Sequence, residues 1–307
     1  MTGPRKPTPL AARAGLLALL GLVAARPLAA DDAKVAPSAA AASPATDVTP
    51  APPAAAPDDL EVDPAEPDFG VVVLPTNLRL PRHKLAFRLT HRFTRPLGQG
   101  DFSDLRSDFF GFDGGAQIGL GLRFGLFSGT QLGFYRLSDR TIQFNVQQEL
   151  VRQSEHAIGL SAVASVEGLD NFSQDYSPAL SLVVSRKLGS RGAVYAVPTF
   201  VGNTNLTAED LTSDDSTLVL GLGARLLVGR STALVGEYHP RLAGYKGNRG
   251  SGDSKSLVTF GIEKRVGGHA FQLNFSNDLG TTPAQTARGQ QGVDDWFIGF
   301  NITRKFY

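Results

Sequence analysis

Apolar and polar residues alternate along this chain from about residue 84 to Tyr307, in runs separated by connectors. In the last run, one side carries large apolar residues and the other carries small or polar ones: Trp296, Ile298, Phe300 and Ile302 against Gly299, Asn301 and Thr303. A period of two is the spacing of a β-strand with one apolar face. The alternation therefore predicts an all-β fold.

The connectors between the runs fall into two classes that alternate in order. We predict twelve strands, with cores at 84–93, 116–126, 130–137, 141–151, 156–167, 178–188, 193–201, 216–228, 232–240, 255–265, 269–277 and 294–306. Short turns (127–129, 152–155, 189–192, 229–231, 267–268) alternate with longer polar loops (94–115, 168–177, 202–215, 241–254, 278–293), and the short 138–140 is an exception. An even strand number with short turns at one end predicts a closed antiparallel transmembrane β-barrel of the bacterial outer membrane.

The two faces of the strands can be assigned from their charges. An arginine at the lipid midplane costs ~2 to 4 kcal/mol, so the faces that carry arginine should line the lumen. The lumen-lining candidates are Lys84, Arg88, Arg92, Arg123, Glu149, Arg225, Glu237, Glu263, Asn301 and Lys305. The residues expected to face lipid include Leu120, Leu122, Phe144, Leu180, Leu182, Phe260, Ile262, Phe271 and Leu273. Phe306, rather than the terminal Tyr307, is in phase with the apolar face of the last strand.

Composition agrees with strands rather than helices as the membrane spans. The chain has 34 Gly and 19 Phe but one Met, and no apolar run of helix-spanning length follows residue 30. Five aromatic residues are expected to anchor the barrel at the membrane interfaces: Trp296, Tyr135, Tyr195, Tyr238 and Tyr307. The absence of cysteine excludes disulfides, thiolate metal sites and cysteine catalysis.

The first 67 residues differ in composition from the rest. Residues 1–30 read as a signal peptide, with a basic start and an apolar middle of about eleven residues, which is too short for a membrane anchor. Residues 31–67 contain twelve Ala and eight Pro, which predicts a disordered periplasmic tether. The barrel is expected over 68–307. Residues 69–307 carry 25 basic and 20 acidic groups, too mild an excess to indicate nucleic-acid binding.

Three segments of the chain carry a recognisable pattern: 108–125, which contains Phe-Phe-Gly-Phe-Asp-Gly-Gly, together with 268–277 and 297–304. In these segments the chain resembles a family of bacterial outer-membrane β-barrels of unknown function. The resemblance covers about residues 75–307 and implies a barrel and its compartment. It implies no substrate and no catalytic residue.

Five basic residues should share one wall of the barrel: Lys84, Arg88, Arg92, Arg123 and Lys305. One interpretation is an electropositive stripe that draws anions into the lumen. The other is a structural ladder in which these cations pair with Glu149, Glu237 and Glu263. We favour the ladder, because the interior has room for long polar side chains and the opposite charges are present.

Other chemistry finds little support in the sequence. The five histidines are dispersed without metal-ligand spacing, and no nucleophile motif accompanies them, so we expect no metal, no cofactor and no enzyme activity. Acidic loop residues such as Asp101, Asp104 and Asp108 are expected to be solvated rather than to bind cations.

Three functional hypotheses stay open. The leading one is a porin-like conduit for small polar solutes in contact with outer-membrane lipid. The second is a closed structural or docking barrel that recruits a periplasmic partner through the tether. The third is an outer-membrane hydrolase.

Overall fold

A single antiparallel sheet of thirteen strands makes up most of the computed structural model, which describes residues 63–153, 157–206, 215–245, 255–289 and 295–307. The strands are β1 (Leu85–Phe93), β2 (Ala116–Phe127), β3 (Thr130–Leu137), β4 (Ile142–Val151), β5 (Gly159–Gly168), β6 (Gln174–Lys187), β7 (Gly192–Gly202), β8 (Ser216–Leu227), β9 (Thr232–His239), β10 (Arg241–Gly244), β11 (Leu257–Val266), β12 (His269–Ser276) and β13 (Phe297–Phe306). The helices are α2 (Phe102–Ser107), the 3₁₀ turn η1 (Phe109–Gly111), α3 (Leu169–Phe172) and α4 (Pro283–Arg288).

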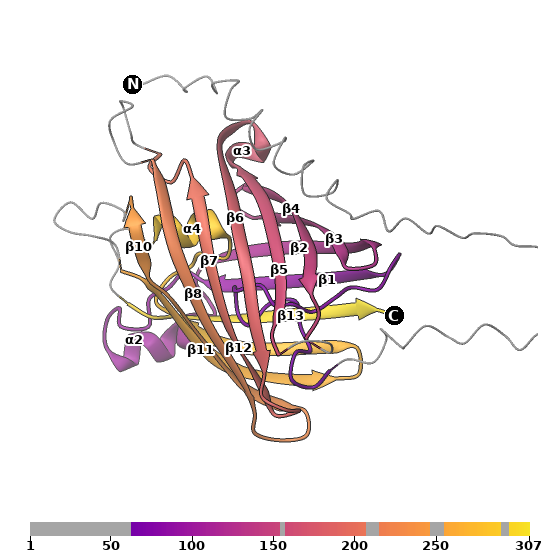
Figure 1. Cartoon of the computed structure of the whole chain (residues 1–307). Helices are drawn as coiled ribbons and strands as arrows, with labels where there is room; N and C mark the ends of the chain where they lie inside the picture. Colours follow the sequence, from indigo (N-terminus) through magenta and orange to yellow (C-terminus); the bar gives the residue numbers. More distant parts are fainter. Residues whose placement is uncertain (1–62, 154–156, 207–214, 246–254, 290–294) are drawn as a thin grey trace, which may run out of the picture.

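The sheet closes into a barrel because the first strand pairs with the last (Figure 1). Leu85 lies opposite Phe306, and the register runs without a break to Arg92 opposite Gly299. Strand β10 continues past Pro240 along β8, so β9 and β10 form one stave of a twelve-stave barrel. The prediction of a closed antiparallel barrel of about twelve strands is confirmed. Closure leaves no sheet edge unpaired, which a barrel in hydrocarbon requires.

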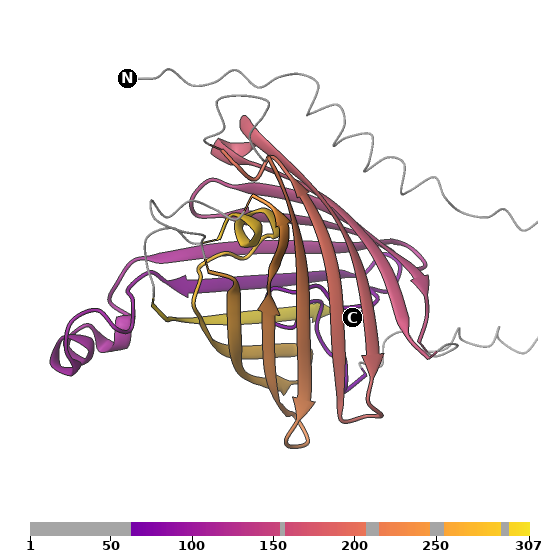
Figure 2. The same cartoon turned by 60° about the vertical axis from the view of Figure 1, so that its left-hand side comes forward.

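The two ends of the barrel differ. Short turns join β2 to β3, β6 to β7, β8 to β9 and β11 to β12, and the C-terminus lies at the same end. All of the described helices lie in connections at the opposite end, which we call the loop end. Figure 2 shows α4 within the ring of strands at the loop end, and α2 projecting away from the barrel. The loop end is therefore partly covered from inside by the connection between β12 and β13.

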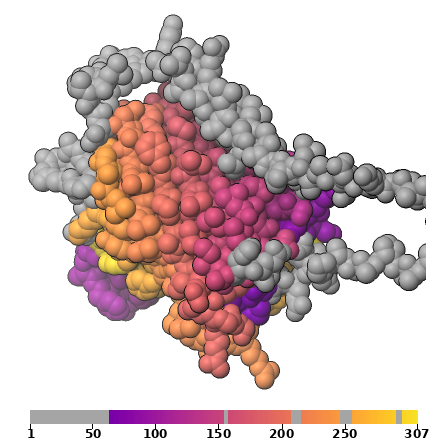
Figure 3. Space-filling model, in the orientation of Figure 1, coloured from indigo at the N-terminus to yellow at the C-terminus, as the bar shows by residue number. Residues whose placement is uncertain are grey.

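The outer surface is apolar, as the alternation predicts. Figure 3 shows β5 to β8 side by side in a continuous wall. The exposed large apolar residues of the strands include Leu120, Leu122, Phe144, Leu180, Leu182, Phe260, Ile262, Phe271 and Leu273. Phe306 is exposed, whereas Tyr307 packs against Phe69, Leu80 and Ala86 inside the barrel. Among the described residues, no helix combines the length and hydropathy that crossing a bilayer takes.

A charged residue on the outer face should destabilise the barrel most near the bilayer midplane and least near the membrane interfaces. We expect Leu120→Arg, in β2, to lower the free energy of unfolding in vesicles by about 2–4 kcal/mol. Leu188→Arg, which makes the same change at an exposed residue of a short turn, should cost about 0–1 kcal/mol. Urea titration of the vesicle-inserted protein measures both, and equal costs for the two variants would contradict the lipid-facing assignment of β2.

Candidate functional site

The lumen contains part of the protein's own chain. Residues 63–80, which we call the plug, precede β1 and lie inside the barrel with buried side chains: Ala65, Glu66, Asp68, Phe69, Val71, Val72, Leu74, Thr76 and Leu80. The barrel was predicted over 68–307, and the buried Ala65 and Glu66 lie just before that boundary, within the predicted tether. The predicted signal peptide and the tether up to residue 62 lie outside the described residues.

The plug turns back on itself at its tip. The Val71 N–H donates to the Leu74 carbonyl at 2.9 Å, and the Thr76 N–H donates to the Phe69 carbonyl at 3.1 Å. Gly70 and Pro75 form a β-bridge at the base of this turn. The turn leaves the N–H groups of the next residues free to bond to the barrel wall.

One buried carboxylate holds the tip. Glu237, on β9, accepts hydrogen bonds from the backbone N–H groups of Val72, of Val73 at 3.0 Å and of Leu74 at 2.9 Å. Its second oxygen lies 3.0 Å from Nε2 of His239. Successive N–H groups that converge on one anion form a backbone nest, and hydrogen bonds to a charged acceptor are worth about 1.5–3 kcal/mol each. Glu237 is therefore the main polar anchor of the tip.

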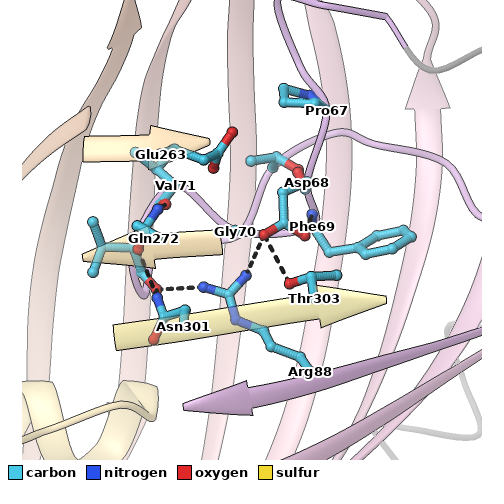
Figure 4. A network of polar contacts seen from close by, with 12 residues as sticks. Pro67, Asp68, Phe69, Gly70, Val71, Arg88, Glu263, Gln272, Asn301 and Thr303 are labelled. Atoms are coloured by element: carbon cyan, nitrogen blue, oxygen red, sulfur yellow. Dashed lines mark hydrogen bonds and ion pairs between the residues drawn. The ribbon is translucent and has the colours of Figure 1, made fainter. Parts of the chain in front are cut away.

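A second anchor lies farther around the wall, on β1 and β13 (Figure 4). The Asp68 carboxylate of the plug accepts from Arg88 Nη1 at 3.1 Å and from Thr303 Oγ1 at 2.9 Å. Arg88 Nη2 also donates to the Val72 carbonyl at 2.6 Å. Nearby, Gln272 donates to the Val71 carbonyl at 2.6 Å and Asn301 donates to the Val72 carbonyl at 3.1 Å. The plug backbone thus satisfies polar groups of β1, β12 and β13.

The plug also covers an apolar part of the wall. Val71, Val72 and Leu74 form one buried cluster with residues of β6, β7 and β9: Val183, Ala193, Tyr195, Val197 and Val235. On β8, a Cβ at Gly221 or at Gly223 would clash with Leu74, so these glycines make room for the plug tip. The inner side of this part of the wall is apolar and leaves space for Leu74, so it suits contact with the plug better than contact with water.

Residues 277–289, which follow β12 and which we call the loop, fill the lumen from the loop end. Ala284 and Ala287 of α4 pack against Ala179, Val201 and Val219 on the inner wall. In the same connection, Arg288 Nη1 donates to Glu167 at 2.8 Å, and Thr282 donates to the same carboxylate. Arg241 donates to the last carbonyls of α4, at 3.2 Å from that of Thr286. Plug and loop therefore enter the barrel from opposite ends.

The lumen-lining candidates do not form the expected ladder. Arg225 pairs with Glu263, but Arg88 pairs with Asp68 of the plug, and Glu149 pairs with Arg79 and Arg152. The remaining cations bond to neutral groups: Arg92 to Asn301 and to the carbonyls of His91 and Phe300, Arg123 to Gln147, and Lys305 to the Pro67 carbonyl. Lys84 precedes β1 and is half-buried. Asp68 of the plug is thus the counterion of Arg88, in place of the strand carboxylates that were expected to pair with it.

Three of the expected interface tyrosines lie inside the barrel: Tyr307, which packs against Phe69, together with Tyr135 and Tyr195. Tyr135 bonds to Thr281 of the loop at 3.0 Å and to Thr90, and Tyr195 is buried in the plug cluster. Tyr135 and Tyr195 are in phase with the inward residues of β3 and β7, so the period-two alternation itself places both side chains inside the barrel. Inward valines such as Val183 and Val197 make their strands apolar on both faces. Such strands are typical of sheets covered on both sides, so these valines could have indicated an occupied lumen.

The titratable groups of the described residues form no recognisable catalytic or metal centre. No group of three or more His, Asp or Glu side chains is arranged to hold a metal ion in this part of the chain. His239 contacts Glu237, and neither residue bonds to a hydroxyl there. In the first loop, Asp101 and Asp104 cap α2, and Asp108 pairs with Arg95.

Comparison with known proteins identifies the family. Residues 69–306 match a family described as membrane bound beta barrel domain (DUF5777). The chain belongs to this family. The match begins within the plug, at Phe69, so it covers the plug tip together with every strand of the barrel. No curated protein matches the chain.

Solved structures similar to the chain include a porin, an outer membrane protein and an outer membrane channel. The NanC porin is 8% identical and aligns over 73% of this chain and 99% of its own, with a TM-score of 0.47. The outer membrane protein Omp33 of Acinetobacter baumannii is 10% identical over 73% and 98%, with a TM-score of 0.40. An outer membrane channel from Pseudomonas putida F1 is 12% identical over 74% and 97%, with a TM-score of 0.41.

Weakening the Glu237 anchor should release the plug tip. In a Val73→Cys background, whose cysteine is unique because the chain has none, we expect Glu237→Gln to speed labelling by a bulky polyethylene-glycol maleimide at least tenfold. The reason is that neutral hydrogen bonds replace charge-assisted ones, and about 1.4 kcal/mol corresponds to a factor of ten. Glu167→Gln, an equally buried carboxylate that anchors the loop, is the matched control and should leave the rate unchanged. Equal rates in all three proteins would contradict the anchor.

Docking of the plug should weaken as pH rises. Burial raises the pKa of Glu66, although the hydrogen bond from Asn77 and the charge of Lys187 oppose this. A carboxyl with a raised pKa in the docked state stabilises docking at low pH, and this contribution is lost as pH rises through that pKa. We expect the labelling rate of Val73→Cys, divided by that of the Val73→Cys/Glu66→Gln protein, to increase between about pH 4 and about pH 8. A constant or falling ratio would contradict this role of Glu66.

Proposed function

We propose that the protein is an outer-membrane barrel that conducts small polar solutes when the plug leaves the lumen. The observation that carries the proposal is the chemistry of the contact between plug and wall. Arg88, Gln272 and Asn301 bond to plug carbonyls, and Glu237 bonds to plug N–H groups. Water can replace backbone groups as partners of these side chains, so the polar part of the contact can open at a modest net cost.

The charge of the wall also supports a conduit. Once Asp68 leaves, no carboxylate of the described residues remains within ion-pair distance of Arg88, Arg92, Arg123 or Lys305. Three of these residues lie on β1 and β2, and Lys305 lies on the adjoining β13. The opened wall would be hydrated and cationic, as the linings of anion-conducting pores are.

A second candidate is a barrel that stays closed and serves as a structural or docking element for a periplasmic partner. The specific observation in its favour is the apolar cluster, because Val183, Val197 and Val235 would face water if Val71, Val72 and Leu74 left. Exposing apolar surface costs about 25 cal/mol per Å². The two candidates therefore differ in whether the polar anchors or the apolar cluster decide the position of the plug.

A reversible disulfide between the plug and the wall tells the two candidates apart. Val71 Cγ2 lies 3.5 Å from an ideal Cβ at Gly223, so Val71→Cys and Gly223→Cys place two thiols within disulfide reach. Leu74→Ala accompanies them, because the Leu74 side chain would otherwise clash with the new Cβ at position 223. We expect this protein, combined with Glu237→Gln, to conduct in planar bilayers when reduced, to lose conductance when oxidised and to regain it on reduction. The Leu74→Ala/Glu237→Gln protein, which cannot form the disulfide, is the control and should not respond to oxidant.

The closed-barrel candidate gives a different result in the same recordings. If Glu237→Gln exposes the plug tip to the maleimide reagent while the bilayer conductance stays at the level of the unmodified protein, plug release does not open a path. That outcome would overturn the conduit and favour the docking barrel.

A further inference from the structure

A cavity of about 120 Å³ remains between the plug, the loop and one side of the wall. Its lining combines three parts of the chain: Val72 and Val73 of the plug tip, Thr281 and Pro283 of the loop, and inward residues of β1 to β6. The inward glycines Gly121 and Gly133 also line it. The cavity therefore exists in the closed barrel and depends on the plug being in place.

An arginine without a counterion lines this cavity. Arg123, on β2, makes two contacts: its Nη1 lies 3.5 Å from Gln147 Oε1, and its guanidinium stands 5.5 Å from the centre of the Phe69 ring. Both partners are neutral, and no carboxylate of the described residues lies within ion-pair distance of Arg123. A guanidinium has five N–H donors, so most of them have no protein acceptor.

The nearest anchors do not neutralise this charge. Arg88, which lies beside Arg123 because Ala86 pairs with Arg123 and Arg88 with Gly121, takes the Asp68 carboxylate for itself. Two guanidinium groups thus line one side of the cavity, and a carboxylate pairs with Arg88 but not with Arg123. A cation withdrawn from bulk water is costly unless an anion pairs with it.

The rest of the lining suits the apolar part of a ligand. Phe69, Val73, Val163 and Pro283 contribute carbon surface, and Tyr135 and Asn145 contribute hydrogen-bonding groups. An apolar protein cavity of about 150 Å³ accommodates benzene, so this cavity has room for about six non-hydrogen atoms. The arginine fork matches a carboxylate, which it binds with two parallel hydrogen bonds.

We propose that the closed barrel binds a short-chain monocarboxylate in this cavity, with the carboxylate on Arg123 and the aliphatic part against Phe69, Val73 and Val163. The inference goes beyond the proposed function because it concerns the plugged barrel and does not require that a solute cross it. The bound anion would neutralise Arg123 and contact the plug, so it would also stabilise the closed state.

Calorimetric titration of the full chain in detergent micelles tests the site, with butyrate as the probe and butyramide as its neutral isostere. We expect saturable binding of butyrate, with butyramide binding at least tenfold more weakly. Arg123→Gln should weaken butyrate binding at least tenfold. Arg186→Gln removes the same charge from an exposed arginine of β6 and should leave binding unchanged. Arg123→Lys, which keeps the charge without the planar fork, should give an intermediate affinity.

The remaining outcomes contradict the site. Equal affinity for butyrate and butyramide, no saturable butyrate binding, or binding that survives Arg123→Gln in a protein with an unchanged far-ultraviolet circular dichroism spectrum would each overturn it. None of these results depends on conductance, so failure of the anion site and failure of the conduit can be told apart.

Discussion

Closure of the sheet is the constraint on which the rest of this structure depends. Hydrocarbon cannot satisfy backbone groups, so β1 must pair with β13 and every strand must present an apolar side outward. The same alternation turns arginine, glutamate and glutamine side chains into a narrow interior. These groups need partners there, and the plug provides many of them with its own backbone and with Asp68.

The interior has two chemical regions. Along β1, β12 and β13 the wall is polar and bonds to plug carbonyls, whereas along β6, β7 and β9 it is apolar and packs against plug valines and Leu74. A water-filled pore needs only the first kind of wall. The second kind, with glycines on β8 that leave space for Leu74, fits a lumen that the plug occupies. If the plug left the lumen, that apolar region would be exposed to water.

The barrel could be predicted from the sequence because a period of two is a local property of each strand. The short-turn and long-loop classes followed from composition in the same way. The plug could not, because it has no periodicity, and its contacts join residues that lie far apart in the sequence, such as Val72 and Glu237. Pairing of Arg88 with Asp68 instead of a strand carboxylate depends on the same long-range placement. Tyr195 was misassigned because aromatic residues near strand ends are common at membrane interfaces, although its phase with Val197 places it inside.

Hydrogen exchange of the plug amides in the membrane-inserted protein tests most directly whether the barrel is closed by its own N-terminal segment. The N–H groups of Val72, Val73 and Leu74 bond to a buried carboxylate, so their exchange should be slow and comparable to that of the β1 amides. Glu237→Gln should accelerate exchange at these three amides while leaving β1 unchanged. Exchange of these amides at the rate of an unstructured peptide in the unmodified protein would contradict the plugged lumen.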